Sequence, residues 1–143
     1  MTGRVLAVDV GARRVGLAIS DASGTLARPL ETIAVTSDAD AVDRVARRID
    51  ELVREGDGLA AIVVGMPAAL DGTATPESAR ASAFIAALSK RTPLAIATED
   101  ERLTSREAES RLAAGERDWR KRKRKLDAAA AAIILQDYLD RRT

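Results

Sequence analysis

Apolar and polar residues follow two different periods along the chain, and these periods predict strands first and helices afterwards. Residues 4–10 are almost continuously apolar, and residues 15–21 alternate with a period of two, which predicts two strands joined by a tight turn. A third strand is predicted over 27–35. Because the connections are short, we expect these three strands to form an antiparallel meander.

Helical spacing begins directly after the third strand. Ser37 or Asp38 is the expected N-cap of a first helix. Apolar residues then recur at helical spacing until Gly56 and Gly58, which we expect to end the helix. The nearly continuous apolar run at 59–67 predicts a strand that is covered on both faces.

Helix and strand continue to alternate in the second half of the chain. Thr75 and Pro76 are the expected N-cap and first residue of a second helix. A fifth strand is predicted over 93–101. Capping-box spacing predicts a short helix from 104 to about 115, and a final Ala-rich helix is predicted over 126–142.

This order of elements predicts one α/β domain over residues 1–143. The sheet should begin with the antiparallel meander and continue with parallel strands, because the later strands alternate with helices. Such a mixed sheet flanked by helices is the layout of a ribonuclease H-like domain. The sequence contains no internal repeat and no linker long enough to divide it.

Composition narrows the chemistry. The chain has no Cys and no His, which excludes disulfides, cysteine nucleophiles, imidazole bases and imidazole metal ligands. An enzyme of this composition must use carboxylates, Lys, Arg, hydroxyls or bound metal ions. Because Cys is absent and no apolar run approaches the roughly 18 residues of a membrane helix, we expect a cytoplasmic protein outside the membrane. The net charge of +1 does not indicate a partner.

Carboxylates stand at three places where the pattern calls for apolar residues. Asp9 lies late in the first strand, and Asp127 opens the last helix. The end of the fifth strand carries Glu99, Asp100 and Glu101. Strands of open α/β sheets place ligand sites at their carboxyl ends, so we expect the strand acids to lie near each other.

The last helix must lie across the same edge for Asp127 to join these acids. Residues 128–132 are all Ala, which gives this helix a slim face and lets its backbone approach the sheet closely. Several carboxylates in one cleft suit Mg²⁺ or Mn²⁺. Two such ions activate a water and stabilise the leaving oxygen of a phosphodiester.

Each acid also has a purely structural interpretation. Asp9 could be a hydrogen-bond acceptor beside the following turn. The acids at 99–101 could stabilise the N-terminus of the next helix, and Asp127 could be an N-cap. The metal hypothesis therefore depends on the whole set of acids.

Basic residues adjoin these acids and suggest a nucleic-acid partner. Six consecutive cations precede Asp127, namely Arg120, Lys121, Arg122, Lys123, Arg124 and Lys125. A charge run is commonly a solvated loop, but this run could also grip phosphates in a salt-dependent way. Trp119 could stack on a base or anchor the loop. Three further arginines next to the acids are expected to contact the nucleic-acid backbone: Arg13, Arg14 and Arg102.

Four motifs taken together resemble the YqgF (RuvX) family of pre-16S ribosomal RNA nucleases, which are related to RuvC-type Holliday-junction resolvases. They are AVDVGARRVGLAISD, VVGMPAALDGTATPESA, EDERLTSREAE and KLDAAAAAIILQDYL, in this order along most of the chain. The resemblance implies a ribonuclease H-like fold and hydrolysis of RNA with Mg²⁺ or Mn²⁺, two ions being expected. The implied role is trimming the 5′ end of precursor 16S RNA.

Carried over by position, the resemblance implies that Asp9, Glu101 and Asp127 are the catalytic metal ligands, with Asp100 as the competitor of Glu101. The approach to the last acid departs from the family, because the basic run RKRKRKL replaces a Gly-Lys-Gly-like segment. That departure affects the expected mode of substrate binding more than the assignment of the acids.

Three other functions compete with this interpretation. DVGARRVG also resembles the first phosphate loop of actin-like ATPases, but those proteins need two such domains, and the chain has no P-loop motif. A non-catalytic RNA-binding assembly factor could keep the fold without using the acids. A resolvase of branched DNA would use the same chemistry but would need a symmetric dimer, so both a monomer and a homodimer stay open.

Overall fold

Five strands form one mixed sheet in the computed structural model, which describes residues 3–67, 73–100 and 119–142, without the side chains of 119–126. The strands are β1 (Arg4–Val10), β2 (Arg14–Ser20), β3 (Ala27–Ala34), β4 (Leu59–Met66) and β5 (Ala95–Asp100). Their order across the sheet is β3-β2-β1-β4-β5. β2 is antiparallel to β1 and β3, whereas β4 is parallel to β1 and β5. The predicted meander followed by parallel strands is confirmed.

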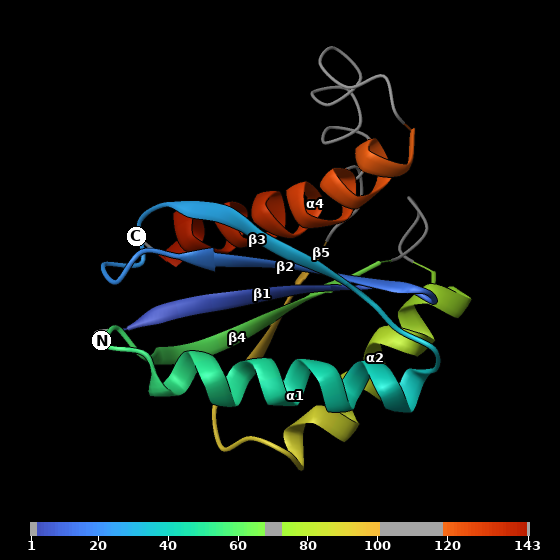
Figure 1. The fold of residues 1–143 in the computed structure, drawn as a ribbon, viewed down its shortest axis with the longest axis horizontal. Coiled ribbons are helices and arrows are strands. Elements are labelled where there is room, and N and C mark those ends of the chain that lie inside the picture. Colours follow the sequence, from blue (N-terminus) through green and yellow to red (C-terminus); the bar gives the residue numbers. More distant parts are fainter. Residues whose placement is uncertain (1–2, 68–72, 101–118, 143) are drawn as a thin grey trace.

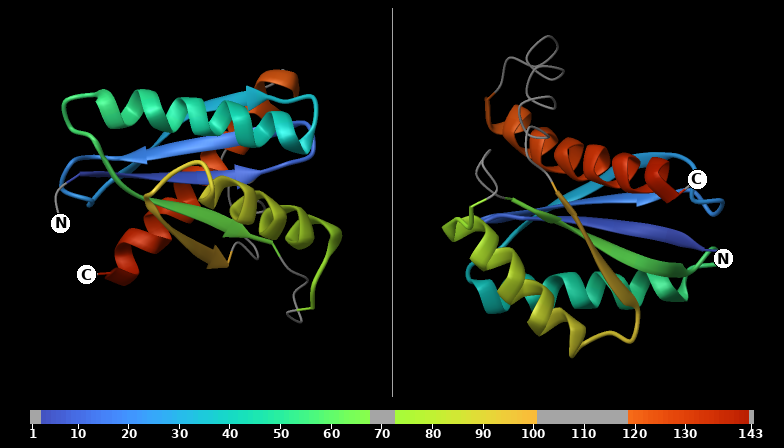
Figure 2. Two further views of the ribbon diagram at one scale, coloured as in Figure 1. Left: turned by 90° about the horizontal axis from the view of Figure 1, so that it is seen from below. Right: turned by 180° about the vertical axis from the view of Figure 1, so that it is seen from behind.

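Helices cover both faces of the sheet (Figures 1 and 2). α1 (Asp38–Arg54) and α2 (Pro76–Ser89) lie on one face, and α4 (Trp119–Arg142) lies alone on the other within the part of the chain that the structure describes. The predicted caps are confirmed. The Ser37 side chain accepts a hydrogen bond from the Asp40 amide, and Thr75 forms a capping box with Ser78.

Two boundaries differ from the sequence prediction by more than one residue. β5 begins at Ala95, two residues after its predicted start. The last helix begins at Trp119, so the basic run belongs to α4 and Asp127 lies eight residues inside the helix instead of capping it. The physical reason is that Lys and Arg are good helix formers. A run of charges is typical of a solvated loop, so the charge pattern alone did not predict a helix. The short helix predicted from 104 lies outside the described residues.

The core divides into two layers because strand residues alternate between the faces. In β1, Leu6 and Val8 pack toward α1 and α2, whereas Val5 and Ala7 pack toward α4. The larger layer contains most of the buried Val, Ile and Leu side chains. The layer under α4 is built largely from small side chains, so α4 lies close to the sheet.

One buried arginine joins the first strand to the end of the first helix. Arg4 is 8% exposed, and its Nε donates a hydrogen bond to the Gly58 carbonyl at 3.0 Å. Its Nη2 donates to the Leu52 carbonyl at 3.2 Å and to Glu55 at 2.9 Å. The guanidinium therefore adds a second hydrogen bond to the Leu52 carbonyl, which also accepts from the Glu55 amide, and ties the last turn of α1 to the turn that leads into β4.

No helix among the described residues is both long enough and apolar enough to cross a membrane.

Candidate metal-binding active site

Asp9 lies near the carboxyl end of β1, on the face that carries α4. Side chains of successive strand residues point to opposite faces. Val5 and Ala7 belong to the layer under α4, and Asp9 continues the same series. Asp9 pairs across the antiparallel ladder with Gly16 of β2.

Gly16 is a point at which α4 comes very close to the sheet. A Cβ atom built on Gly16 would lie 2.2 Å from the backbone oxygen of Asp127 and 2.5 Å from its carbonyl carbon. No side chain fits into that space. Because Gly16 is the partner of Asp9, this contact places Asp127 over the pair and brings the two predicted acids to the same part of the sheet.

Arg14, which lies in β2 like Gly16, forms an ion pair with Asp127 of α4. Arg14 lies two residues before Gly16 in β2, and its Nε is 3.2 Å from Asp127 Oδ2. Both side chains are largely covered, at 29% and 26% exposed. The role predicted for Arg14 is contact with the nucleic-acid backbone, and the structure shows that its guanidinium is engaged with a carboxylate of the candidate site.

The end of β5 separates its two described acids onto opposite faces. Glu99 follows Ala97 on the α4 face, where it is 5% exposed and forms an ion pair with Arg141 near the end of α4. The same alternation puts Asp100 on the other face, where its side chain is exposed. The Glu99–Arg141 pair holds β5 to the last turn of α4.

The structure describes only some of the other predicted site residues. Glu101 and Arg102 lie outside the described residues. The backbone of Arg120–Lys125 is helical, as the first two turns of α4. Arg13 is exposed in the turn between β1 and β2, and its carbonyl accepts a hydrogen bond from the Val35 amide at 2.9 Å.

Three features of the site were not predicted from the sequence: the contact at Gly16, the pairing of Arg14 with Asp127, and the partner of Glu99. A glycine inside an alternating strand marks a bulge or a close backbone approach, so the sequence did hold a signal for Gly16. Nothing in the sequence indicated Arg141, which is 42 residues from Glu99.

The chemistry of the donors that are in place suits a divalent cation. Asp9 and Asp127 supply carboxylate oxygens, which Mg²⁺ and Mn²⁺ prefer, and Mg²⁺ is commonly held by only one or two carboxylates plus water and substrate phosphates. Within the described residues, no group of three or more Asp, Glu, His or Cys side chains is close enough to hold an ion. Glu101, the third ligand that the sequence analysis predicts, lies outside the described residues.

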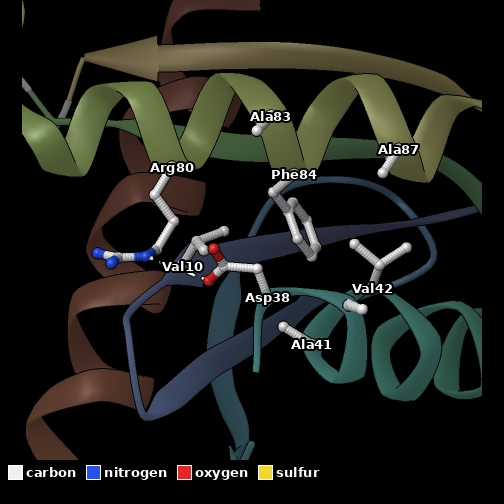
Figure 3. Close-up of a pocket in the computed structure, with 9 residues that line it drawn as sticks. Val10, Asp38, Ala41, Val42, Arg80, Ala83, Phe84 and Ala87 are labelled. Atoms are coloured by element: carbon white, nitrogen blue, oxygen red, sulfur yellow. Dashed lines mark hydrogen bonds and ion pairs between the residues drawn. The ribbon is translucent and has the colours of Figure 1, made fainter. Parts of the chain in front are cut away.

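A separate cavity of about 210 Å³ lies on the opposite face, between α1 and α2 (Figure 3). Its wall is mostly apolar and includes Val10 and Phe84, and Arg80 and Asp38 pair beside it at 3.4 Å. Val10 follows Asp9 directly, but the alternation of β1 directs the two side chains to different faces. The cavity is therefore distinct from the acid site.

Known proteins resemble this chain over nearly its whole length. A family model described as "RuvX: Holliday junction resolvase" matches residues 3–141. A protein of Lactiplantibacillus plantarum named "Putative pre-16S rRNA nuclease" is 40% identical over 141 residues, covering 96% of this chain and 94% of that protein. A protein of Leifsonia xyli with the same name is 42% identical over 139 residues, covering 97% and 86%.

A solved structure shares the fold. Thermus thermophilus RuvC in complex with a Holliday junction superposes with a TM-score of 0.55 at 15% identity, covering 98% of this chain and 95% of that one. The likeness extends over the whole mixed sheet, and it confirms the predicted ribonuclease H-like fold. With the family model matching nearly every residue and relatives at about 40% identity, this chain belongs to the RuvX family.

Proposed function

We propose that this protein is a metal-dependent endonuclease that hydrolyses RNA, with the 5′ region of precursor 16S ribosomal RNA as its substrate. The observation that carries the proposal is the close approach of α4 to Gly16, which brings Asp127 to the strand pair that contains Asp9. The names of the relatives support the choice of substrate.

In this proposal Asp9, Asp127 and Glu101 hold Mg²⁺ or Mn²⁺, with two ions expected. Such ions, when bound, activate a water and stabilise the leaving oxygen of the phosphodiester. Asp100 is the weaker candidate for the third position, because it lies on the face opposite to Asp9. The protein itself contributes fixed carboxylates and a site free of imidazole and thiol groups.

In this proposal the cations around the site bind the RNA substrate. We assign Arg13, Arg102 and the basic run (Arg120–Lys125) to the RNA backbone. The basic run and Asp127 belong to the same helix, so the run lies within about two helical turns of Asp127. Binding should therefore depend strongly on salt.

Cleavage of a precursor 16S RNA fragment tests the proposal. We expect the wild-type protein to cut the fragment in Mg²⁺ or Mn²⁺ and not in chelator, because carboxylates alone do not activate water for this reaction. The products are mapped by primer extension. RNA that is bound but left intact in every metal would contradict the nuclease assignment and favour a non-catalytic assembly factor.

A junction-cleaving DNA nuclease is the second candidate, favoured by the description of the family model and by the RuvC-like fold. The same protein preparation should be given a four-way DNA junction beside the RNA fragment. Symmetric cutting of the junction, without cutting of the RNA, would replace the proposed substrate. Analytical ultracentrifugation with the junction would then show whether a dimer acts.

Neutralising part of the basic run should weaken RNA binding. We expect the double variant Arg120→Gln/Arg124→Gln to lower the affinity for RNA. It should also reduce the steepness of log K against log salt by about two, because each cation that touches a phosphate contributes about one to that slope. Filter binding in chelator at several salt concentrations measures both quantities.

The matched control for this variant is a double change on α1, Arg47→Gln with Arg54→Gln, at two exposed positions of a helix on the opposite face of the sheet. The control should leave the salt slope unchanged. An equal effect of the two double variants would make the basic run an ordinary solvated segment.

A further inference from the structure

We propose that Arg14 and Gly16 of β2 form a seat for α4, the α4 seat, that sets the position of Asp127 relative to Asp9. Gly16 fixes the helix backbone at Asp127, and Arg14 fixes its carboxylate. Both are positioning residues, since they act through Asp127. The inference rests on the proposed function, which assigns Asp9 and Asp127 to the metal.

Gly16 sets how near the helix lies. The space above its Cα is filled by the backbone oxygen and carbon of Asp127, at 2.2 and 2.5 Å from where a Cβ would be. Both atoms are backbone, so they cannot rotate out of the way as a side chain does. Ordinary contact distances are about 3.5 Å, and a methyl group at this position would therefore displace α4 by about 1 Å.

Such a displacement of α4 would change the distance between Asp9 and Asp127. Asp9 and Gly16 are direct partners in the β1–β2 ladder, so the contact at Gly16 governs the separation between the β1 carboxylate and α4. A misplacement of about 1 Å at a reacting group can cost about 100-fold in rate. This part of α4 is packed tightly, since Ala128, Ala130 and Ala131 are all buried.

Arg14 sets how the carboxylate is turned. Asp127 Oδ2 is buried, and Arg14 Nε lies 3.2 Å from it. The ion pair neutralises a charge that is mostly withdrawn from water, and it holds one oxygen of the carboxylate against β2. Removal of the guanidinium leaves a partly buried negative charge without this cation, which favours rotation of the carboxylate away from β2.

The first experiment compares Gly16→Ala with Gly56→Ala. Gly56 is the matched control, because a Cβ built there meets no heavy atom within 4 Å. We expect Gly16→Ala to weaken Mn²⁺ binding at least about tenfold and to lower kcat about 100-fold, with KM for RNA within about twofold. Gly56→Ala should match wild type in all three. Calorimetric titration of Mn²⁺ and the far-UV circular dichroism of each variant are measured on the same preparation.

The second experiment tests the carboxylate with Arg14→Gln, Arg14→Lys and Arg13→Gln. Arg14→Gln should weaken Mn²⁺ binding and leave RNA affinity in chelator within about twofold, and Arg14→Lys should restore part of the Mn²⁺ affinity. Arg13→Gln should do the reverse, lowering RNA affinity only. Tighter Mn²⁺ binding in Arg14→Gln would make Arg14 a competitor of the metal, and a salt slope reduced by about one would make it a phosphate contact. Either result overturns its positioning role.

Failure of the α4 seat and failure of the proposed function give different results. If wild type binds Mn²⁺ and cleaves RNA, and Gly16→Ala does both equally well, the seat is wrong while the function stands. If wild type does neither, the proposed function is wrong. Crystal structures of Gly16→Ala and Gly56→Ala then test whether Gly16 sets the position of α4. A helix displaced only in Gly16→Ala supports it, and an undisplaced helix overturns it. If Gly16→Ala does not fold, the Arg14 variants decide.

Discussion

Asp9→Asn should abolish RNA cleavage while leaving the protein folded. The substitution keeps the size of the side chain and an oxygen acceptor but removes the charge that holds a divalent cation. We expect the rate to fall at least about 1000-fold, which corresponds to about 4 kcal/mol of transition-state stabilisation. The protein should remain folded under native conditions, because the substitution keeps the size of the side chain and disturbs neither the β1–β2 ladder nor the core.

Single-turnover cleavage of the precursor fragment and urea unfolding measure these two quantities. Asp57→Asn is the matched control, because Asp57 is exposed in the turn between α1 and β4 and belongs to neither the acids nor the basic run. It should cleave like wild type. Full activity of Asp9→Asn would remove Asp9 from the reaction and, with it, the central assignment of the site.

Leu135→Ala should cost the protein about 2–5 kcal/mol of unfolding free energy, as large-to-small changes in packed cores do. Leu135 is fully buried on the face of α4 that meets the sheet, where it packs in a layer with Val5, Ala18 and Val63. That layer contains few large side chains, so a cavity at Leu135 removes a large share of the packing that holds α4. The loss is a substantial part of the about 5–15 kcal/mol of stability that a domain possesses.

Urea unfolding followed by circular dichroism gives the value. Val53→Ala on α1 is the comparison, since Val53 is 47% exposed and its truncation leaves no cavity. It should change the unfolding free energy by less than about 0.5 kcal/mol. If the two variants were equally stable, α4 would not be held by the buried layer, and the placement of Asp127 would need another explanation.

The strands and caps could be predicted from the sequence because their signals are local. Alternation at 15–21 and the pair Thr75–Pro76 each specify structure within a few residues, and the structure has β2 and α2 there. The start of α4 could not be predicted in the same way. Its first two turns carry a run of cations, whose helical propensity competes with the mutual repulsion that favours a solvated segment.

The candidate site was predictable as a set of residue types but not as a set of contacts. Asp9 and Asp127 stand out in the sequence because carboxylates interrupt apolar patterns there. The pairing of Arg14 with Asp127 joins residues more than one hundred positions apart, and only the packing of α4 on β2 brings them together. Glu99 and Arg141 are 42 positions apart, and they meet only because α4 also packs near β5. Long-range ion pairs leave no periodic signal in a sequence.

The continuity of α4 makes it a molecular ruler. Arg120 and Asp127 are seven residues apart in one uninterrupted helix, a span of about 10 Å at 1.5 Å per residue. A flexible linker would allow a range of separations between the place where a strand is gripped and the place where it is cut. A rigid helix permits only one separation. In the proposed function, the number of residues between the basic run and Asp127 therefore sets the position of the cut relative to the bound phosphates.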